Sequence, residues 1–308
     1  MRTVRAVTLL LAVALLVSGC GRDRPAEDPP KGVLTVGSGT DPESALIAEM
    51  YVLALTKAGY QVTDRTGVGD RSASLRALQQ GSVDLVPGDL AGLTTWFDVQ
   101  RNGAGSVAHP VASGDAARTL AGLRALLRGG PLEAGRLSPA RHQVSFAVTK
   151  QLADQRDLRG VADLARLDGP LVLGGPPGCP TDPACMPGLQ RVYGVTVTSF
   201  RPLGEISGKP VLDALEDGTV QVGMVLSSAG GVAESNLVVL TDDRGLRDAG
   251  NLLALYRTTV PAEARDVVEK VNQALTTEKL QELNKKLDSD GADPADLAKL
   301  FLRDAGLV

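Results

Sequence analysis

Short β-branched and apolar runs alternate along this chain with segments of helical period, and this alternation constrains the fold more than any other feature. Residues 33–36 form the first such run, and a glycine-rich turn follows them. Apolar residues at helical spacing then predict a helix that is capped by Asp41 and stops at Gly59, before a second strand at residues 61–65. A strand, helix, strand order implies parallel strands joined by a right-handed crossover, so the sequence predicts an α/β fold.

The same pattern continues along the chain and ends in helices alone. Further strands are expected at residues 83–86, 144–148, 171–174 and 220–226. Further helices are expected at residues 72–80, 158–167, 188–193, 210–216, 261–275, 277–287 and 294–305, the last of them capped by Asp293.

The first residues have the pattern of an export signal. Arg2 and Arg5 give a positive start, and the apolar run that follows is too short for a membrane-spanning helix of about 20 residues. Residues 16–20 resemble the lipobox of bacterial lipoproteins, which implies removal of residues 1–19 and acylation of the Cys20 thiol. The alternative is an ordinary secretory signal in which Cys20 is incidental. Residues 20–31, rich in proline and charge, predict a flexible tether.

Composition narrows the classes of partner. Removal of residues 1–19 takes away two arginines and no acid, which leaves 30 Lys and Arg against 36 Asp and Glu. A mildly acidic chain is a poor partner for nucleic acid, which favours a basic face. With 43% apolar and 22% charged residues the chain is an ordinary globular one, long enough for one large lobe or two smaller ones.

Two further cysteines, Cys179 and Cys185, lie in a loop that contains several prolines. Outside the cytoplasm two thiols this close are expected to form a disulfide, provided that their Cα atoms approach to about 6 Å. Metal binding is the alternative, but no histidine or further cysteine stands nearby to complete a tetrahedral set. We therefore expect a disulfide that holds the shape of the loop.

Motifs of catalysis and of cofactor binding are mostly missing. The chain has only two histidines, His109 and His142, and neither has the spacing of a metal pair or of a catalytic triad. The Gly-x-Gly pairs at residues 37–39 and 67–69 lack the third glycine of a dinucleotide fingerprint, and no Lys-Ser or Lys-Thr follows for a phosphate loop. We therefore expect neither an enzyme nor a protein with a bound cofactor or metal.

Several fragments, taken in their order and spacing, resemble the substrate-binding proteins of glycine betaine/choline (osmoprotectant) ABC importers. They are residues 34–38, 48–51, 58–62, 67–69, 77–85, 192–194, 212–218, 236–243 and 275–284. The resemblance implies a type II periplasmic-binding-protein fold, in which two α/β lobes are joined by two crossovers and hold a ligand in the cleft between them. It places the crossovers near residues 141–144 and 247–251, lobe I at residues 32–141 plus 250–308, and lobe II at residues 142–249.

The ligand site is where this sequence departs from the family. Members that bind betaine surround its quaternary ammonium with tyrosines, whose faces attract a diffuse cation. Aligned without gaps, those tyrosine positions fall on Asp89, Val144, Leu226 and Gly250, the lysine that binds the carboxylate in some members falls on Gly39, and an arginine falls on Asp182. The four tyrosines of the chain are each better interpreted as packing residues, so we expect the aromatic cage to be lost.

What remains predicts a roomier cleft with acidic and amide groups in place of a cationic anchor. Polar residues there would bind a hydroxylated ligand, two apolar residues would flank a ring, and Asp89 offers the alternative of pairing with a cationic head group. Trp96 and Phe97 either supply one aromatic wall or belong to the core. The candidate ligand-binding residues are Gly39, Asp89, His142, Val144, Leu226, Ser227, Gly250 and Asn251.

The resemblance implies a lipid-anchored binding protein that captures a small molecule outside the cytoplasm and delivers it to an ABC permease and its ATPase by hinge closure. Its anchor in the cell membrane would be Cys20, and nucleic acid is not an expected partner. The alternative is a sensor or partner-docking module with no transport role. A third class, a hydrolase that uses His142, lacks a triad or a metal set.

Overall fold

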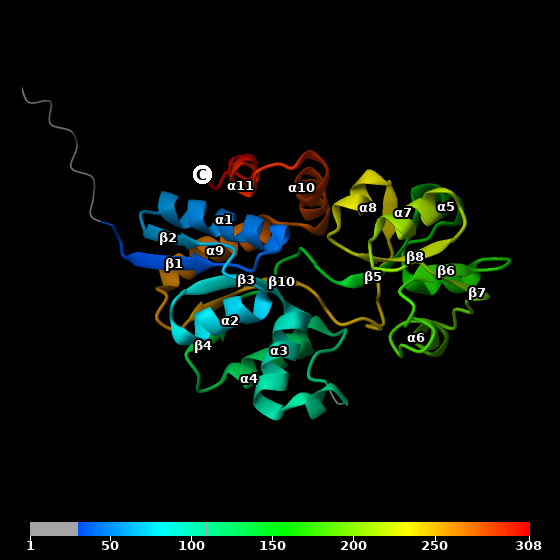
Figure 1. The fold of residues 1–308 in the computed structure, drawn as a ribbon, viewed down its shortest axis with the longest axis horizontal. Coiled ribbons are helices and arrows are strands. Elements are labelled where there is room, and N and C mark those ends of the chain that lie inside the picture. The colour runs from blue at the N-terminus through cyan, green and yellow to red at the C-terminus, as the bar shows by residue number, and fades with distance from the viewer. Residues whose placement is uncertain (1–29, 109) are drawn as a thin grey trace, which may run out of the picture.

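The computed structural model describes residues 30–308 except residue 109, and these residues form two α/β lobes that lie side by side (Figure 1). The predicted signal peptide, Cys20 and most of the predicted tether lie outside the described residues. Among the described helices, none combines the length and the apolar character needed to cross a membrane.

The sheet of lobe I has five strands in the order β2-β1-β3-β10-β4. β1 pairs in parallel with β2 and β3, as the alternation of strands and helices predicts, whereas β10 runs antiparallel to β3 and β4. β10 comes from a much later part of the chain, so the lobe is built from two separate segments. The strands are β1 Val33–Gly37, β2 Gln61–Arg65, β3 Leu85–Asp89, β4 Leu132–Ala134 and β10 Leu252–Arg257.

The sheet of lobe II repeats this pattern with strands from one continuous segment. Its order is β7-β6-β8-β5-β9, with β6 parallel to β7 and β8, and β5 antiparallel to β8 and β9. The two sheets therefore have the same sequence of strand directions, and the predicted two-lobe α/β fold is confirmed. The strands are β5 Val144–Thr149, β6 Val172–Gly175, β7 Ser199–Pro202, β8 Val222–Leu226 and β9 Leu237–Val239.

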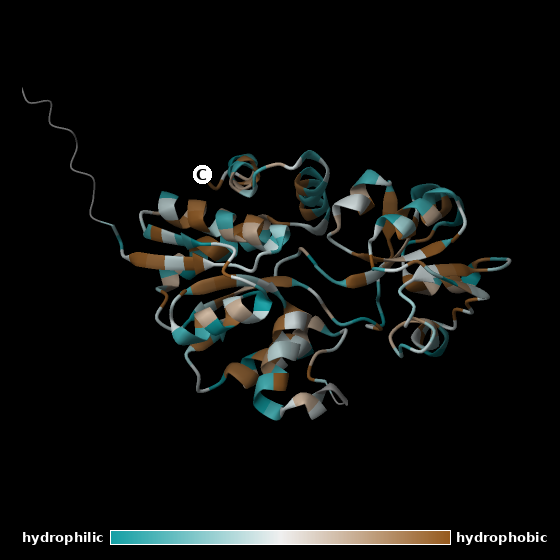
Figure 2. Cartoon of the chain, in the orientation of Figure 1, coloured by the Kyte–Doolittle hydropathy of each residue, from teal (hydrophilic) through white to brown (hydrophobic). Residues whose placement is uncertain are grey.

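Helices cover both faces of the sheet in lobe I, and the apolar strands lie between them (Figure 2). α1, α9, α10 and α11 contribute to one buried apolar cluster, and α2, α3 and α4 contribute to another. Removal of this apolar surface from water is the main force that stabilises the lobe. The elements are α1 Pro42–Lys57, α2 Arg71–Gln80, α3 Leu90–Asn102, a 3-10 turn Ala104–Ala108, α4 Ala116–Leu127, α9 Ala262–Ala274, α10 Thr277–Asp290 and α11 Pro294–Asp304.

The helices of lobe II are shorter, and one prediction there is wrong. The helix expected at residues 158–167 is a 3-10 helix, Val161–Arg166, preceded by α5 Lys150–Arg156. Asp157 ends α5 because it adopts a left-handed backbone conformation with φ 48°. The remaining elements are α6 Met186–Gly188, a π-helical turn Leu189–Tyr193, α7 Lys209–Glu216 and α8 Gly230–Glu234.

The two crossover segments run beside each other between the lobes. His142 N donates a hydrogen bond to Gly250 O at 2.7 Å, and Leu252 N donates to Ala140 O at 2.9 Å. A Cβ atom at residue 250 would overlap the backbone of His142, so the close pairing requires glycine there. The strands of the two sheets separate at these segments, near the expected lobe boundaries, which stay a prediction.

A third connection between the lobes is made by α10 and α8, which lie next to each other in Figure 1. Gln281 and Asn284 of α10 donate side-chain hydrogen bonds to the backbone oxygens of Ser227 and Ser228, at 2.6 Å and 2.8 Å. Gly230 opens α8, and a Cβ atom there would overlap the backbone of α10. The C-terminal part of the chain therefore contacts lobe II by its backbone as well as by its side chains.

A half-buried acidic group in lobe I, Glu49, generates a prediction about stability. Burial, followed by the negative charges of Asp64 and Asp293, raises the pKa of Glu49 to about 7. The proton on Glu49 therefore stabilises the folded state in acid, and this contribution is lost as pH rises through about 7. We expect Glu49→Gln to abolish that loss of stability. The loss is on the order of 1 kcal/mol, because partial exposure of the carboxyl weakens the effect of its raised pKa.

Urea denaturation at about pH 5.5 and about pH 8 measures this difference. The variant should gain stability relative to the natural protein at the higher pH. Glu278→Gln, at an exposed position on α10, is the matched control and should show no such gain. An equal effect of Glu49→Gln at both pH values would contradict the prediction.

Candidate functional site

A pocket of about 340 Å³ lies in lobe I where α1, α2 and α3 begin. We call it the lobe I pocket. Its lining includes the apolar side chains of Ile47, Leu75, Leu93 and Leu252 together with charged side chains of the first helical turns. The four apolar side chains are almost fully buried and belong to the clusters on the two faces of the sheet. The lobe I pocket therefore pairs apolar walls with a charged rim.

A second pocket, of about 460 Å³, lies between the lobes, and we call it the interlobe pocket. Lobe I contributes Ala91 to it, and lobe II contributes Val144 and Leu226. Three further residues, Arg71, Asp89 and His142, line both pockets. The two pockets therefore adjoin, and together they form a cleft between the lobes.

Asp89 links three parts of lobe I at this junction. Its Oδ1 accepts a hydrogen bond from Gly92 N at 2.7 Å and so caps α3, while its Oδ2 lies 2.7 Å from Nη2 of Arg71. A Cβ atom at residue 92 would overlap the guanidinium group, so glycine makes room for Arg71 over the start of α3. The sequence predicted acidic and amide groups in place of a cationic anchor, and the structure places the guanidinium group of Arg71 in the cleft, paired with Asp89. No local sequence signal identified Arg71, because the pairing joins the starts of two helices.

His142 forms an ion pair with Glu43, a residue that the sequence analysis did not identify. His142 Nδ1 lies 2.8 Å from Glu43 Oε1 and 2.9 Å from the hydroxyl of Ser228, and Asn284 Nδ2 donates to Glu43 Oε2 at 2.5 Å. Burial alone would lower the pKa of His142, but the hydrogen bond and charge of Glu43 outweigh it and raise that pKa. Burial alone would raise the pKa of Glu43, but the hydrogen bond and the charge of His142 outweigh burial and lower that pKa. Each member of the pair therefore favours the charged form of the other.

The lobe II wall of the cleft consists of two strand ends and a loop. Val144 and Leu226 face each other directly in the register of β5 and β8, and both line the interlobe pocket. The loop is closed by a disulfide between Cys179 and Cys185, with 5.2 Å between their Cα atoms, as predicted. Proximity of the two cysteines in the sequence was enough to predict this bond.

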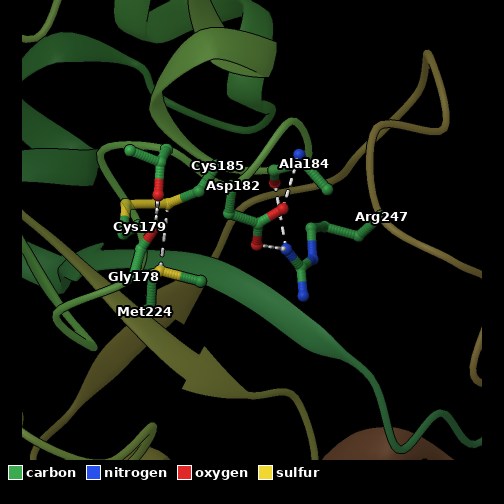
Figure 3. Close-up of a disulfide and its surroundings, with 8 residues drawn as sticks. Gly178, Cys179, Asp182, Ala184, Cys185, Met224 and Arg247 are labelled. Atoms are coloured by element: carbon green, nitrogen blue, oxygen red, sulfur yellow. Dashed lines mark hydrogen bonds and ion pairs between the residues drawn. A yellow bond between two sulfur atoms is a disulfide. The ribbon is translucent and has the colours of Figure 1, made fainter.

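The disulfide loop holds an arginine from another segment (Figure 3). Arg247 Nη1 donates hydrogen bonds to Asp182 Oδ2 at 3.2 Å and to Ala184 O at 3.0 Å. The family's arginine position falls on Asp182 in this sequence. A guanidinium group thus reaches the same loop from the returning crossover, where sequence alignment did not indicate it.

The other predicted site residues divide into two groups. Gly39 lines the lobe I pocket. Ser227, Gly250 and Asn251 line neither of the two pockets, and their polar groups bind the crossover segments. Ser227 Oγ donates to Arg141 O at 2.7 Å, and Asn251 Nδ2 donates to a backbone oxygen of lobe I at 2.9 Å. Contact of any predicted residue with a ligand stays a prediction.

Aromatic rings are absent from the lining of both pockets among the described residues, apart from the imidazole of His142. Trp96 packs edge-on against Phe97, with ring centroids 4.7 Å apart, in an apolar cluster of lobe I. All four tyrosines are at most 5% exposed and belong to the cores, as the sequence indicated; they are Tyr51, Tyr60, Tyr193 and Tyr256. The cleft therefore offers no aromatic cage to a quaternary ammonium group.

The sequence matches the family described as the substrate binding domain of ABC-type glycine betaine transport systems, over residues 32–304. The chain belongs to this family. Members are binding proteins of ABC importers that act outside the cytoplasm, and they are not enzymes. No curated protein matches the chain in sequence.

Solved structures with the same fold are similar to this chain over most of its length. Apo YehZ from Escherichia coli has a TM-score of 0.79 at 21% identity, and the match covers 89% of this chain and 99% of that one. A protein described as a glycine betaine/carnitine/choline ABC transporter has a TM-score of 0.75 at 21% identity, with the same coverage of 89% and 99%. At 21% identity, the similarity to these two structures is evidence for the fold alone.

The ion pair between His142 and Glu43 generates a prediction about pH. The raised pKa of His142 means that its contribution is complete below pH 6.5 and is lost as pH rises through the raised value. The lowered pKa of Glu43 means that its contribution is present above pH 4.5 and is lost in stronger acid. We expect His142→Gln to cost about 2 kcal/mol near pH 6 and clearly less near pH 9.

Urea denaturation of both proteins at the two pH values measures this cost. Lys150→Gln is the control, because it breaks an exposed ion pair with Asp154 and should cost less than about 1 kcal/mol. A loss of stability that is the same near pH 6 and near pH 9 would show that the ion pair does not contribute as described.

Proposed function

We propose that this protein captures a small solute in the cleft between its lobes and delivers it to the permease and ATPase of an ABC importer. Membership of the substrate-binding family and the adjoining pockets of the cleft support this proposal. The lobes would close on the solute about the two crossover segments, which are paired by backbone hydrogen bonds between the two sheets.

The proposal includes a lipid anchor on Cys20. Residues 16–20 have the pattern of a lipobox, and residues 20–31 would then tether the binding domain to the outer side of the cell membrane. A tether of this composition keeps the domain close to its permease and leaves it free to rotate.

The proposed cargo is not glycine betaine. The observation that carries this statement is the lining of the cleft, which holds no aromatic ring other than His142 in the described residues and whose two arginines are each paired with an aspartate. A quaternary ammonium group needs aromatic faces, and a carboxylate needs a free cation. Apolar walls beside charged and amide groups instead favour a hydroxylated or ring-bearing compound.

A thermal-unfolding screen of the purified protein tests this function. The panel contains glycine betaine, choline, carnitine, proline, polyols and plant-type phenolics. A ligand at about a hundred times its Kd should stabilise the protein by about 2.7 kcal/mol and raise the Tm by several degrees. We expect such a rise with a ring-bearing or polyhydroxylated solute and none with glycine betaine at millimolar concentration.

Two results would count against these statements. Tight binding of glycine betaine would refute the proposed cargo and leave solute capture intact. Failure of every solute in this panel and of the matched amines described below, confirmed by calorimetry, would refute solute capture itself.

Replacement of Cys20 by Ala tests the anchor. In a bacterial host that processes lipoproteins, the natural protein should incorporate labelled fatty acid and lose its signal, and Cys20→Ala should do neither. The double variant Cys179→Ala, Cys185→Ala is the control, because it removes two other thiols and should still be labelled. An unlabelled natural protein would contradict the lipid anchor.

A further inference from the structure

Three helices begin at the lobe I pocket, and each of them is capped by an aspartate of its own. The carboxylates of Asp41, Asp70 and Asp89 accept hydrogen bonds of 2.8, 2.7 and 2.7 Å from backbone N–H groups in the first turns of α1, α2 and α3. Free N–H groups and the positive ends of helix dipoles attract anions. Because negative side chains already occupy these ends, the pocket offers little attraction to an anionic ligand.

The charged side chains around the cleft are mostly acidic. The lining of the two pockets contains five carboxylates against two arginines and His142. Arg71 is paired with Asp89, and Arg247 is paired with Asp182. An incoming carboxylate would therefore find both guanidinium groups partly neutralised, whereas an incoming cation would meet an excess of negative charge.

Asp248 contributes a carboxylate that has no partner among the described residues. It follows Arg247 on the returning crossover and lines the interlobe pocket. No donor from residues 30–108 or 110–308 lies within hydrogen-bond or ion-pair distance of it, whereas Glu43, Asp89 and Asp182 all have partners. The side chain of Asp248 is exposed, and partial desolvation raises the pKa of its carboxyl, which the charge of Arg247 offsets only in part. A cationic donor from a ligand would bind this carboxylate without displacing an existing partner.

We propose that the solute carries a protonated primary or secondary amine, which donates hydrogen bonds to the carboxylate of Asp248, and an apolar body that enters the lobe I pocket. This inference rests on the proposed function and assigns the charge of its cargo. The apolar body would contact side chains such as Leu75 and Leu93, and the two pockets adjoin because they share three lining residues.

The number of N–H donors distinguishes this amine from a quaternary ammonium group. A primary ammonium donates three hydrogen bonds, and a bond between two charged groups is about twice as strong as a neutral one. A trimethylammonium group donates none and depends on aromatic faces, which the described lining of this cleft lacks outside His142. The cleft therefore selects for an amine that retains its N–H groups.

The test uses matched compounds that share a body and differ in one end. Calorimetry of the purified protein compares 2-phenylethylamine with 2-phenylethanol, 3-phenylpropionate and the N,N,N-trimethyl derivative of the amine, and repeats the comparison with the hexyl series. We expect the amine of at least one series to bind about tenfold or more tightly than its three analogues, and less tightly at high salt. Asp248→Asn should weaken amine binding about tenfold and leave the alcohol unchanged.

Asp243→Asn is the control for this variant. Asp243 lies on the same segment, is exposed and lines neither pocket, so the substitution changes the net charge equally without altering the site. Amine binding that tolerates Asp248→Asn as well as Asp243→Asn would overturn the inference. So would a carboxylate or trimethylammonium compound that binds as tightly as its amine, or amines that do not bind in either series.

These failures are separable from failure of the proposed function. If the amines fail but solutes of the thermal-unfolding panel bind, the assigned charge is wrong and solute capture stands. If neither the matched compounds nor the panel binds, the proposed function is wrong as well.

Discussion

The backbone pairing of the two crossover segments is the contact on which the arrangement of the lobes depends. His142 N donates a hydrogen bond to Gly250 O where the two crossover segments run beside each other between the sheets. The pairing is so close that residue 250 has room for no side chain. Because His142 also lines both pockets, the geometry of the hinge and the geometry of the cleft are set by the same residue.

Features governed by neighbours in the sequence could be predicted, and features governed by distant partners could not. The caps Asp41 and Asp293 act within one helical turn, and the disulfide joins cysteines six residues apart, so local pattern sufficed. The ion pairs of the cleft join segments that meet only after folding, so the hydrophobic periodicity of the sequence does not indicate them. The 3-10 helix Val161–Arg166 was mistaken for an α-helix because apolar spacing does not distinguish such short turns.

Most charged side chains of the cleft form ion pairs with one another. Arg71, Arg247 and His142 each have a carboxylate partner, and the ends of three helices are capped by aspartates. A charged ligand must therefore compete with existing ion pairs or bind the groups that take part in none. The chain belongs to a family described by glycine betaine transport, and the described lining of its cleft contains no aromatic ring other than the imidazole of His142.

The contact between α8 and α10 bears on the proposed closure of the lobes. Because backbone meets backbone at Gly230, this contact would restrain the adjacent side of lobe II in a rotation about the crossover segments, and displacement would grow with distance from it. In Figure 1, α8 lies at the top of lobe II and α6, which follows the disulfide loop, lies at its bottom. In the proposed closure, the disulfide loop with Asp182 would therefore move through a larger arc than α8.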